Sequence, residues 1–450
     1  MRHLFDSFIG VDHLIRTAVL RRLVALLVSS LVLQSSVALA APQHTAAAKS
    51  KAAKATKASK AAKSPKVQKS ATPAKTKKIA PAEPEPSAQG NSTTPGVPEP
   101  PAVPVRAFIV IDAATGRMLT GAGPDERVEP ASITKLMTAY VVFQAIAERR
   151  VALTDNVTIS ERAWRAEGSR TFLQVGTQVP VETLLKGMIV QSGNDAATAL
   201  AERVGGSVEG FATMMNQTAK RIGMTNSNFT NPTGLPSAEL HTTPRDISTL
   251  ARALIREHPQ FYKWYSMREF VWNDIRQPNR NGLLTRDPSV DGIKTGFTDS
   301  AGYCLASSAE RNGMRLISAV FGARSPRKRE DASLALLEYG FAQYETAVLQ
   351  KRSDIVSKPR LYKGASEVAN LVPERDVAVL VKRGEAQGLK VVTTVNQKLV
   401  APLAAGARVG EVQVLAGQTV VSRVPLVTAE ALPTGSILRR ITDTVALWFS

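Results

Sequence analysis

The sequence predicts an α/β (α+β) fold for a large region, 105–350, followed by a small all-β, β-sandwich-like domain, 351–432, and an amphipathic helix, 433–450. Strand patterns open and close the first region, with helical patterns between them, so its two ends meet in one sheet that helices cover. Short alternating runs separated by glycines follow and indicate the β domain. The last segment places its apolar residues on one helical face.

The individual elements follow from these patterns. In the large region, the segment 108–112 is expected to form the opening strand, the runs around Leu305 and Ile317 the closing strands, and 330–341 a helix. In the small domain, glycine-bounded alternation predicts strands at 377–381, 389–395, 409–415 and 419–427.

The C-terminal helix has two interpretations. One face carries apolar side chains and the other carries Arg439, Arg440, Thr442 and Asp443; the apolar set is Ile437, Leu438, Ile441, Val445, Trp448 and Phe449. A helix of this kind that ends in Trp and Phe can lie in a membrane interface. The alternative is a helix packed on the β domain.

The N-terminal part carries export and tether signals. Basic residues precede an apolar run at 23–33, and Ala38-Leu-Ala40 offers a cleavage site, so 1–40 is typical of a secretory signal rather than a retained membrane anchor. Residues 41–104, rich in Lys, Ala and Pro, predict a disordered tether. Because the chain is exported, its eleven lysines between 49 and 78 would meet anionic wall polymers or lipid headgroups rather than nucleic acid. A solvated spacer is the alternative.

The first of three short motifs is Ser132-Ile-Thr-Lys135, at the start of a segment whose apolar residues recur at helical spacing. At i and i+3 the Ser132 hydroxyl and the Lys135 amine point the same way and come within hydrogen-bonding reach. A second match, Ser325-Pro-Arg-Lys328, lacks this context and is expected in a loop. Lysine has a pKa of about 10.4, so burial and a second cation such as Lys294 must lower it before Lys135 can act as a base.

The other two motifs supply the proton relay, the orienting amide and the carboxylate-binding groups that a serine nucleophile needs. Ser192-Gly-Asn194 is expected in a turn between helices, where the hydroxyl relays a proton and the amide orients Lys135 and a substrate carbonyl. Lys294-Thr295-Gly296 is expected on an edge strand or hairpin, where Lys294 and Thr295 meet a substrate carboxylate. The backbone N–H groups of Ser132 and Phe297 are the expected oxyanion donors.

Motif identity, order and surroundings together resemble one family. Glu-Pro-Ala-Ser-Ile-Thr-Lys (129–135), Gln-Ser-Gly-Asn-Asp-Ala (191–196) and Asp-Gly-Ile-Lys-Thr-Gly (291–296) are similar to the low-molecular-mass penicillin-binding proteins of the serine-type D-alanyl-D-alanine carboxypeptidase family. The resemblance implies a penicillin-recognising transpeptidase/β-lactamase-like domain. It also implies that 105–350 is a catalytic region in which Ser132 is the nucleophile, Lys135 the base, Ser192 and Asn194 the relay and orienting groups, and Lys294 the electrostatic clamp. By the same resemblance Arg329 lies near the substrate carboxylate.

The activity implied is removal of the terminal D-alanine from peptidoglycan stem peptides, with acylation of Ser132 by β-lactams. By the same resemblance the C-terminal helix would hold a periplasmic enzyme on the outer face of the cytoplasmic membrane. A murein DD-endopeptidase, a β-lactamase-like hydrolase and an inactive wall-binding scaffold are the alternatives. Phe297 departs from the family, which often has histidine there.

Metal and cofactor chemistry is not expected. The predicted folded region holds only His241 and His258, without the spacing of metal ligands, and Cys304 is the sole cysteine. A zinc site and a Ser-His-Asp triad are therefore disfavoured.

Overall fold

The computed structural model describes residues 86–396 and 398–448. The predicted signal at 1–40, the lysine-rich part of the tether and Phe449 lie outside the described residues. Within them, no helix has the length and the apolar composition needed to cross a membrane.

The catalytic region is built on one antiparallel sheet of six strands. Their spatial order is β1 (Asn91–Ser92), β3 (Met118–Ala122), β2 (Ala107–Asp112), β10 (Met314–Ala323), β9 (Gly302–Arg311) and β8 (Val290–Thr298). The first and last parts of the region therefore meet at the centre of the sheet, as predicted. Strand β8, which carries the third motif, is an edge strand.

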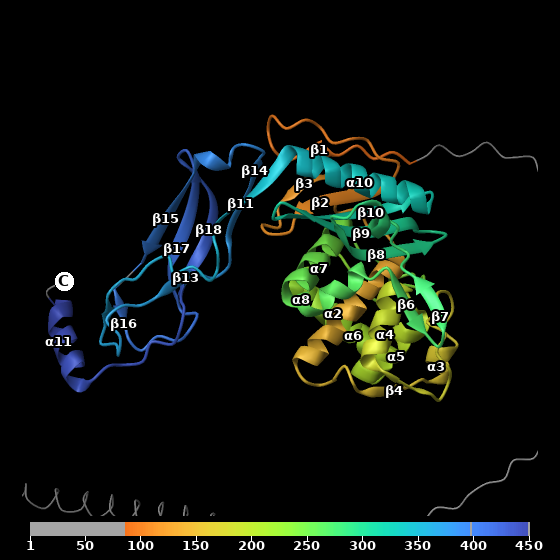
Figure 1. Ribbon diagram of the computed structural model, residues 1–450, viewed down its shortest axis with the longest axis horizontal. Coiled ribbons are helices and arrows are strands. Elements are labelled where there is room, and N and C mark those ends of the chain that lie inside the picture. Colours follow the sequence, from red (N-terminus) through yellow and green to blue (C-terminus); the bar gives the residue numbers. More distant parts are fainter. Residues whose placement is uncertain (1–85, 397, 449–450) are drawn as a thin grey trace, which may run out of the picture. The chain divides into compact units, whose positions relative to one another are not determined.

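Both faces of this sheet are covered (Figure 1). All six residues of β2 are buried, and their side chains alternate between two cores. Phe108 and Val110 belong to the core under helix α10 (Pro326–Gln343), whereas Ile109 and Ile111 belong to the larger core beneath the other helices. Burial on both faces explains why this strand is apolar throughout.

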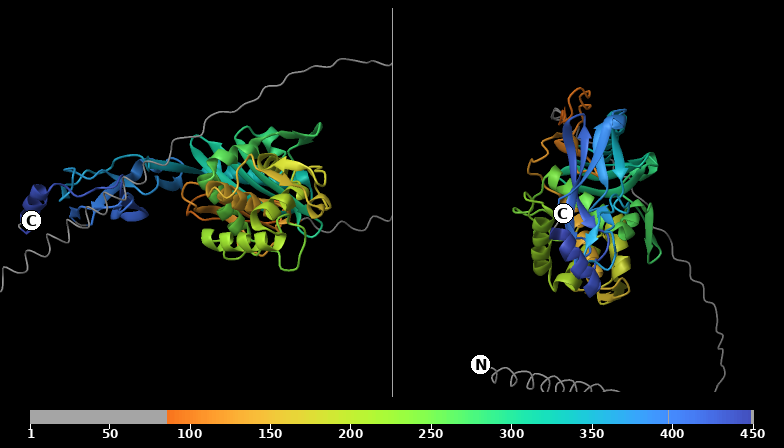
Figure 2. Two further views of the ribbon diagram at one scale, coloured as in Figure 1. Left: turned by 90° about the horizontal axis from the view of Figure 1, so that it is seen from below. Right: turned by 90° about the vertical axis from the view of Figure 1, so that its left-hand side faces the viewer.

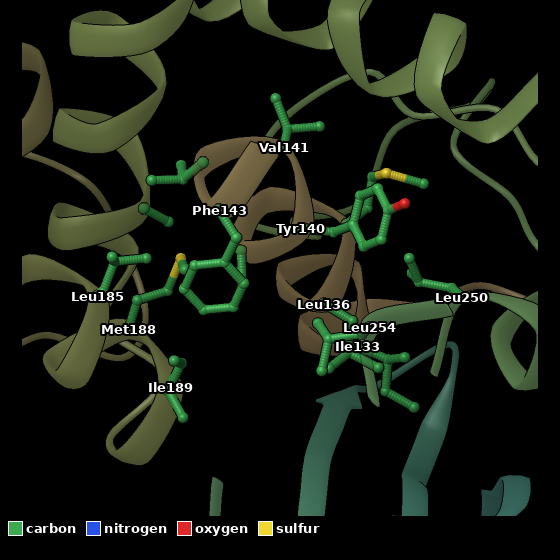
Figure 3. Close-up of a cluster of buried hydrophobic side chains, with 14 of the residues drawn as sticks. Ile133, Leu136, Tyr140, Val141, Phe143, Leu185, Met188, Ile189, Leu250 and Leu254 are labelled. Carbon is green, nitrogen blue, oxygen red and sulfur yellow. The ribbon is translucent and has the colours of Figure 1, made fainter. Parts of the chain in front are cut away.

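The larger core surrounds helix α2 (Lys135–Ala147). Figure 3 shows Phe143 directed toward Leu185 and Met188 of α4 (Val181–Val190), and Leu136 beside Leu254 of α7 (Pro244–Glu257). Because neighbours surround α2, the residues at its N-terminus are held firmly and away from water.

The remaining elements of this part are α3 (Glu161–Trp164), α5 (Asn194–Gly205), α6 (Val208–Ile222), α8 (Pro259–Tyr262), α9 (Leu283–Arg286), the 3-10 turns η1 (Ala131–Thr134) and η2 (Lys263–Ser266), and the hairpins β4 (Asn156–Thr158) with β5 (Gln178–Pro180) and β6 (Glu269–Trp272) with β7 (Ile275–Pro278).

Residues 86–104, which we assigned to the disordered tether, are part of the folded region. Ala88 bridges to Val103, β1 pairs with β3, and the Tyr339 hydroxyl donates to the carbonyl of Pro98 at 2.8 Å. Ala88, Val97 and Val103 are buried in the core under α10. The boundary at 104 was wrong because a proline-rich sequence can still satisfy the open edge of a sheet through its backbone.

The small domain contains the four predicted strands. Strand β13 (Leu371–Pro373) pairs with β18 (Thr419–Thr428), which pairs with β17 (Arg408–Ala416), which pairs with β15 (Leu389–Val395). Strand β14 (Val377–Lys382) pairs with β11 (Tyr344–Gln350), so the domain takes in residues that we placed before 351. The remaining elements are β12 (Leu361–Tyr362) with β16 (Leu399–Val400), the turn η3 (Ala386–Gly388), and the terminal helix α11 (Ile437–Trp448), beside the C label in Figure 2.

Candidate active site

The three motifs meet at one cavity of about 690 Å³. Of the nine residues predicted for the site, seven line it: Ser132, Ser192, Asn194, Thr295, Gly296, Phe297 and Arg329. The other two, Lys135 and Lys294, are buried. The fold thus brings together residues that are far apart in the sequence.

Ser132 and Lys135 form the predicted pair. Ser132 lies in the 3-10 turn η1, which leads directly into α2, and Lys135 is the first residue of α2. A hydrogen bond of 2.9 Å joins Lys135 Nζ to Ser132 Oγ, and Nζ also donates to the carbonyl of Thr233 at 2.6 Å. The amine is therefore held against the hydroxyl from two sides.

The pKa of Lys135 is lowered to about 7, mainly by burial and next by the positive charge of Arg280, whereas the charge of Asp195 acts in the opposite direction. Arg280 is thus a cation near Lys135 that the sequence did not suggest, beside the expected Lys294. Burial also places the pKa of Lys294 well below its ordinary value, with Lys135 and Arg280 as further causes. At neutral pH a substantial fraction of Lys135 is uncharged and able to accept a proton.

Ser192 lies in the turn between α4 and α5, as predicted, and Asn194 is the first residue of α5. Ser192 Oγ and Asn194 Oδ1 are buried and have no hydrogen-bond partner among the described residues. Asn194 Nδ2 donates to the carbonyl of Glu167, and the Asn194 N–H donates to that of Ser169 at 2.7 Å. The Asn194 amide group thus holds the loop beside the cavity, and the predicted contact with Lys135 is not present.

Strand β8 passes close to the nucleophile. A Cβ at Gly296 would lie 3.0 Å from the carbonyl oxygen of Pro130, so only glycine permits this approach without displacement. Lys294 is nearly fully buried, and its Nζ donates to the carbonyl of Thr295 at 3.1 Å. The exposed ring of Phe297 stacks on Tyr303.

Two arginines border the cavity. Arg329, on α10, donates from Nη2 to the carbonyl of Arg280 at 3.2 Å, and its Nε has no partner among the described residues. The second serine-to-lysine match, which we expected in a loop, forms the N-terminus of the same helix, where Ser325 Oγ accepts from the N–H of Lys328. A nucleophile with a buried amine and two guanidinium groups suits acyl transfer from a substrate that ends in a carboxylate.

The sequence did not identify Arg280, Thr233, Gly234 or Asp195. Gly234 has φ +83°, and a Cβ there would lie 1.8 Å from the carbonyl oxygen of Ala131, so it permits the loop to pass under the nucleophile. The Asp195 carboxylate accepts the backbone N–H groups of Thr171 and Leu173. Asp195 directly follows the second motif, which could have drawn attention to it, whereas Arg280 carries no local signal.

Comparisons with known proteins agree with this site. A family model described as D-alanyl-D-alanine carboxypeptidase matches 94–325, and one described as penicillin-binding protein 5, C-terminal domain, matches 344–434. The chain is 41% identical to D-alanyl-D-alanine carboxypeptidase DacC of Escherichia coli over 78% of this chain and 90% of the relative.

Two solved structures are also similar. Penicillin-binding protein 5 of Haemophilus influenzae has a TM-score of 0.66 and 38% identity over 75% of this chain and all of that one. Penicillin-binding protein D2 of Listeria monocytogenes, in an ampicillin-bound form, has a TM-score of 0.50 and 30% identity over 53% of this chain and 98% of that one. The chain therefore belongs to the D-alanyl-D-alanine carboxypeptidase family of serine-type penicillin-binding proteins.

Proposed function

We propose that this protein removes the C-terminal D-alanine from peptidoglycan stem peptides through an acyl-enzyme on Ser132. The observation that supports this most directly is the 2.9 Å contact between Ser132 Oγ and a buried amine whose pKa is about 7. The names of the relatives point to the same reaction.

The reaction follows from the geometry. Neutral Lys135 accepts the Ser132 proton as Oγ attacks the carbonyl carbon of the penultimate D-alanine. The N–H groups of Ser132 and Phe297 stabilise the oxyanion, and Ser192 relays a proton to the leaving amine. The C–N bond breaks, D-alanine leaves, and water then hydrolyses the serine ester to regenerate the enzyme.

The leaving residue carries the carboxylate, so cations and a hydroxyl donor must receive it. Thr295, Arg280 and Arg329 line the cavity beside Gly296 and are the groups that we propose for this contact. An incoming carboxylate also favours the ammonium form of Lys294. A β-lactam offers the same carboxylate beside a strained amide and would acylate Ser132, in keeping with the ampicillin-bound relative.

Mass spectrometry tests the nucleophile. Incubation with benzylpenicillin should add one penicillin mass to the wild type and none to Ser132→Ala, whereas Ser325→Ala, at the second serine-to-lysine match, should still be labelled. Lys135→Ala should slow labelling by about 10² to 10⁴. Release of free D-alanine from diacetyl-L-Lys-D-Ala-D-Ala then tests the reaction. Labelling of Ser132→Ala would contradict the proposal.

We propose further that the exported enzyme rests on a membrane surface through α11. Trp448 is 81% exposed, and Ile437, Leu438, Ile441 and Val445 are exposed beside it. The Asp443 carboxylate, on the opposite face, accepts from the backbone N–H of Lys363 at 2.6 Å and from Arg360 Nη2 at 3.0 Å. These contacts fix the helix with its apolar face outward, where it can enter the headgroup region.

Sedimentation with phosphatidylglycerol vesicles in 0.5 M salt tests this, because the salt suppresses binding by the lysine tail. The full chain should pellet, and a chain lacking 434–450 should remain in solution. The pair Leu438→Gln and Ile441→Gln should weaken binding, whereas Thr442→Gln, on the polar face, should not. Equal pelleting of the truncated chain would contradict the anchor.

For the lysine tail we propose binding to anionic envelope polymers. Replacing its eleven lysines with glutamine should abolish salt-sensitive co-sedimentation with purified anionic cell-wall polymer. Unchanged co-sedimentation would favour the solvated spacer.

A further inference from the structure

Phe297 stands at the mouth of the catalytic cavity with 46% of its surface exposed. Its ring stacks on that of Tyr303, with centroids 4.3 Å apart and planes 29° apart, because the register of β8 and β9 pairs the two residues. We call Phe297 and Tyr303 the aromatic ledge. Both residues also line a neighbouring cavity of about 660 Å³ over the β8–β9 turn. The ledge is therefore a wall shared by two cavities.

The ledge lies at the end of the site that receives the leaving residue. Alternate residues of a strand point to the same face, so Phe297 shares its face with Thr295 and not with Lys294. The guanidinium carbon of Arg329 lies 5.7 Å from the centroid of the Tyr303 ring. Thr295 and Arg329 are groups proposed above for the carboxylate of the leaving residue. The side chain of that residue is thus brought near the ledge.

We infer that the aromatic ledge is a specificity-determining surface for the leaving residue, and that it favours D-residues with apolar side chains. This inference rests on the proposed carboxypeptidase function. An apolar side chain against the exposed ring removes apolar surface of both groups from water. A polar amide side chain of similar size loses hydration without gaining a partner from the ring. The neighbouring cavity offers room for side chains larger than the methyl group of D-alanine.

The reaction itself is unchanged. Peptidyl-D-Ala-D-Xaa and water give peptidyl-D-Ala and D-Xaa, with the C–N bond broken and a proton delivered to the departing amine. Because D-Xaa departs when Ser132 is acylated, selectivity for it is measured by kcat/KM.

Two substrates of matched size provide the test: diacetyl-L-Lys-D-Ala-D-Leu and diacetyl-L-Lys-D-Ala-D-Asn. For the wild type, kcat/KM for D-Leu should exceed that for D-Asn by about tenfold. The ratio should fall below about threefold in Phe297→Ala and stay within about twofold of the wild type in Phe297→Tyr, which keeps the ring. Val348→Ala, which removes an equally exposed apolar side chain on β11, should leave the ratio unchanged.

A wild-type preference for D-Asn, or an equal ratio in the wild type and Phe297→Ala, would overturn the inference. If Phe297→Ala does not fold, Phe297→Leu takes its place in the comparison of substrates. Inhibition of the wild type by free D-amino acids gives a second measurement, in which D-leucine should inhibit at a lower concentration than D-asparagine. Failure of the wild type to release D-alanine from diacetyl-L-Lys-D-Ala-D-Ala would contradict the proposed function instead.

Discussion

Replacing Lys135 with methionine should abolish acylation and stabilise the fold, by an amount that depends on pH. The pKa of this amine is lowered from 10.5 to about 7, with burial as the main cause. A difference of this size corresponds to about 5 kcal/mol against the charged form in the folded state. Methionine keeps the apolar stem and removes the ionisable group, so the penalty disappears with it.

The sign follows from proton uptake. Between pH 7 and 10.5 unfolding lets Lys135 take up a proton, so the wild type gains about 1.4 kcal/mol of stability for each pH unit as pH rises. Below pH 7 the penalty is fully present, and above pH 10.5 it is absent. The stability advantage of Lys135→Met, measured by urea unfolding, should therefore shrink by about 2 to 3 kcal/mol between pH 7.5 and 9.5. Lys294→Met removes a second buried lysine whose pKa is lowered, so its stability advantage should shrink in the same direction as pH rises. An advantage of Lys135→Met that is independent of pH would refute the reasoning.

Three other changes test the surroundings of the site. Asp195→Asn removes the charge that raises the pKa of Lys135 and weakens the hold on the neighbouring loop. The acid limb of the pH profile of the acylation rate should therefore move to lower pH, and urea unfolding should show a loss of about 2 kcal/mol of stability. An acid limb at the wild-type pH would contradict this. Gly234→Ala should slow penicillin labelling more than 100-fold, whereas Gly176→Ala, at a similar φ with nothing near its Cβ, should label normally. Burial lowers the pKa of His258, so as pH falls below about 6.5 this side chain is protonated in the unfolded chain before it is protonated in the folded protein. The wild type should therefore lose more thermal stability between pH 7 and 5 than His258→Phe.

Elements with a complete local pattern could be predicted from the sequence. Strand β15 was predicted with the bounds that the structure gives it, and β2 was predicted to within one residue. The alternation of side chains in a strand is set by its own backbone, so the pattern is visible without knowledge of its neighbours. The folded segment 86–104 has no such pattern. It is held by the open edge of β3 and by Tyr339, which lies more than 200 positions further along the chain.

The active site divides in the same way. The spacing of Ser132 and Lys135 is local, because one turn of chain brings the hydroxyl and the amine to 2.9 Å. The reactivity of the pair is not local, because the carbonyl that holds Lys135 belongs to Thr233. A cation that lowers the pKa of Lys135 belongs to Arg280, which no motif marks. The chemistry of the motif therefore needs an uncharged lysine, but distant segments of the chain lower the pKa of that lysine through burial and charge. For this reason the order of the motifs predicted the reaction, whereas the residues that tune it had to be found in three dimensions.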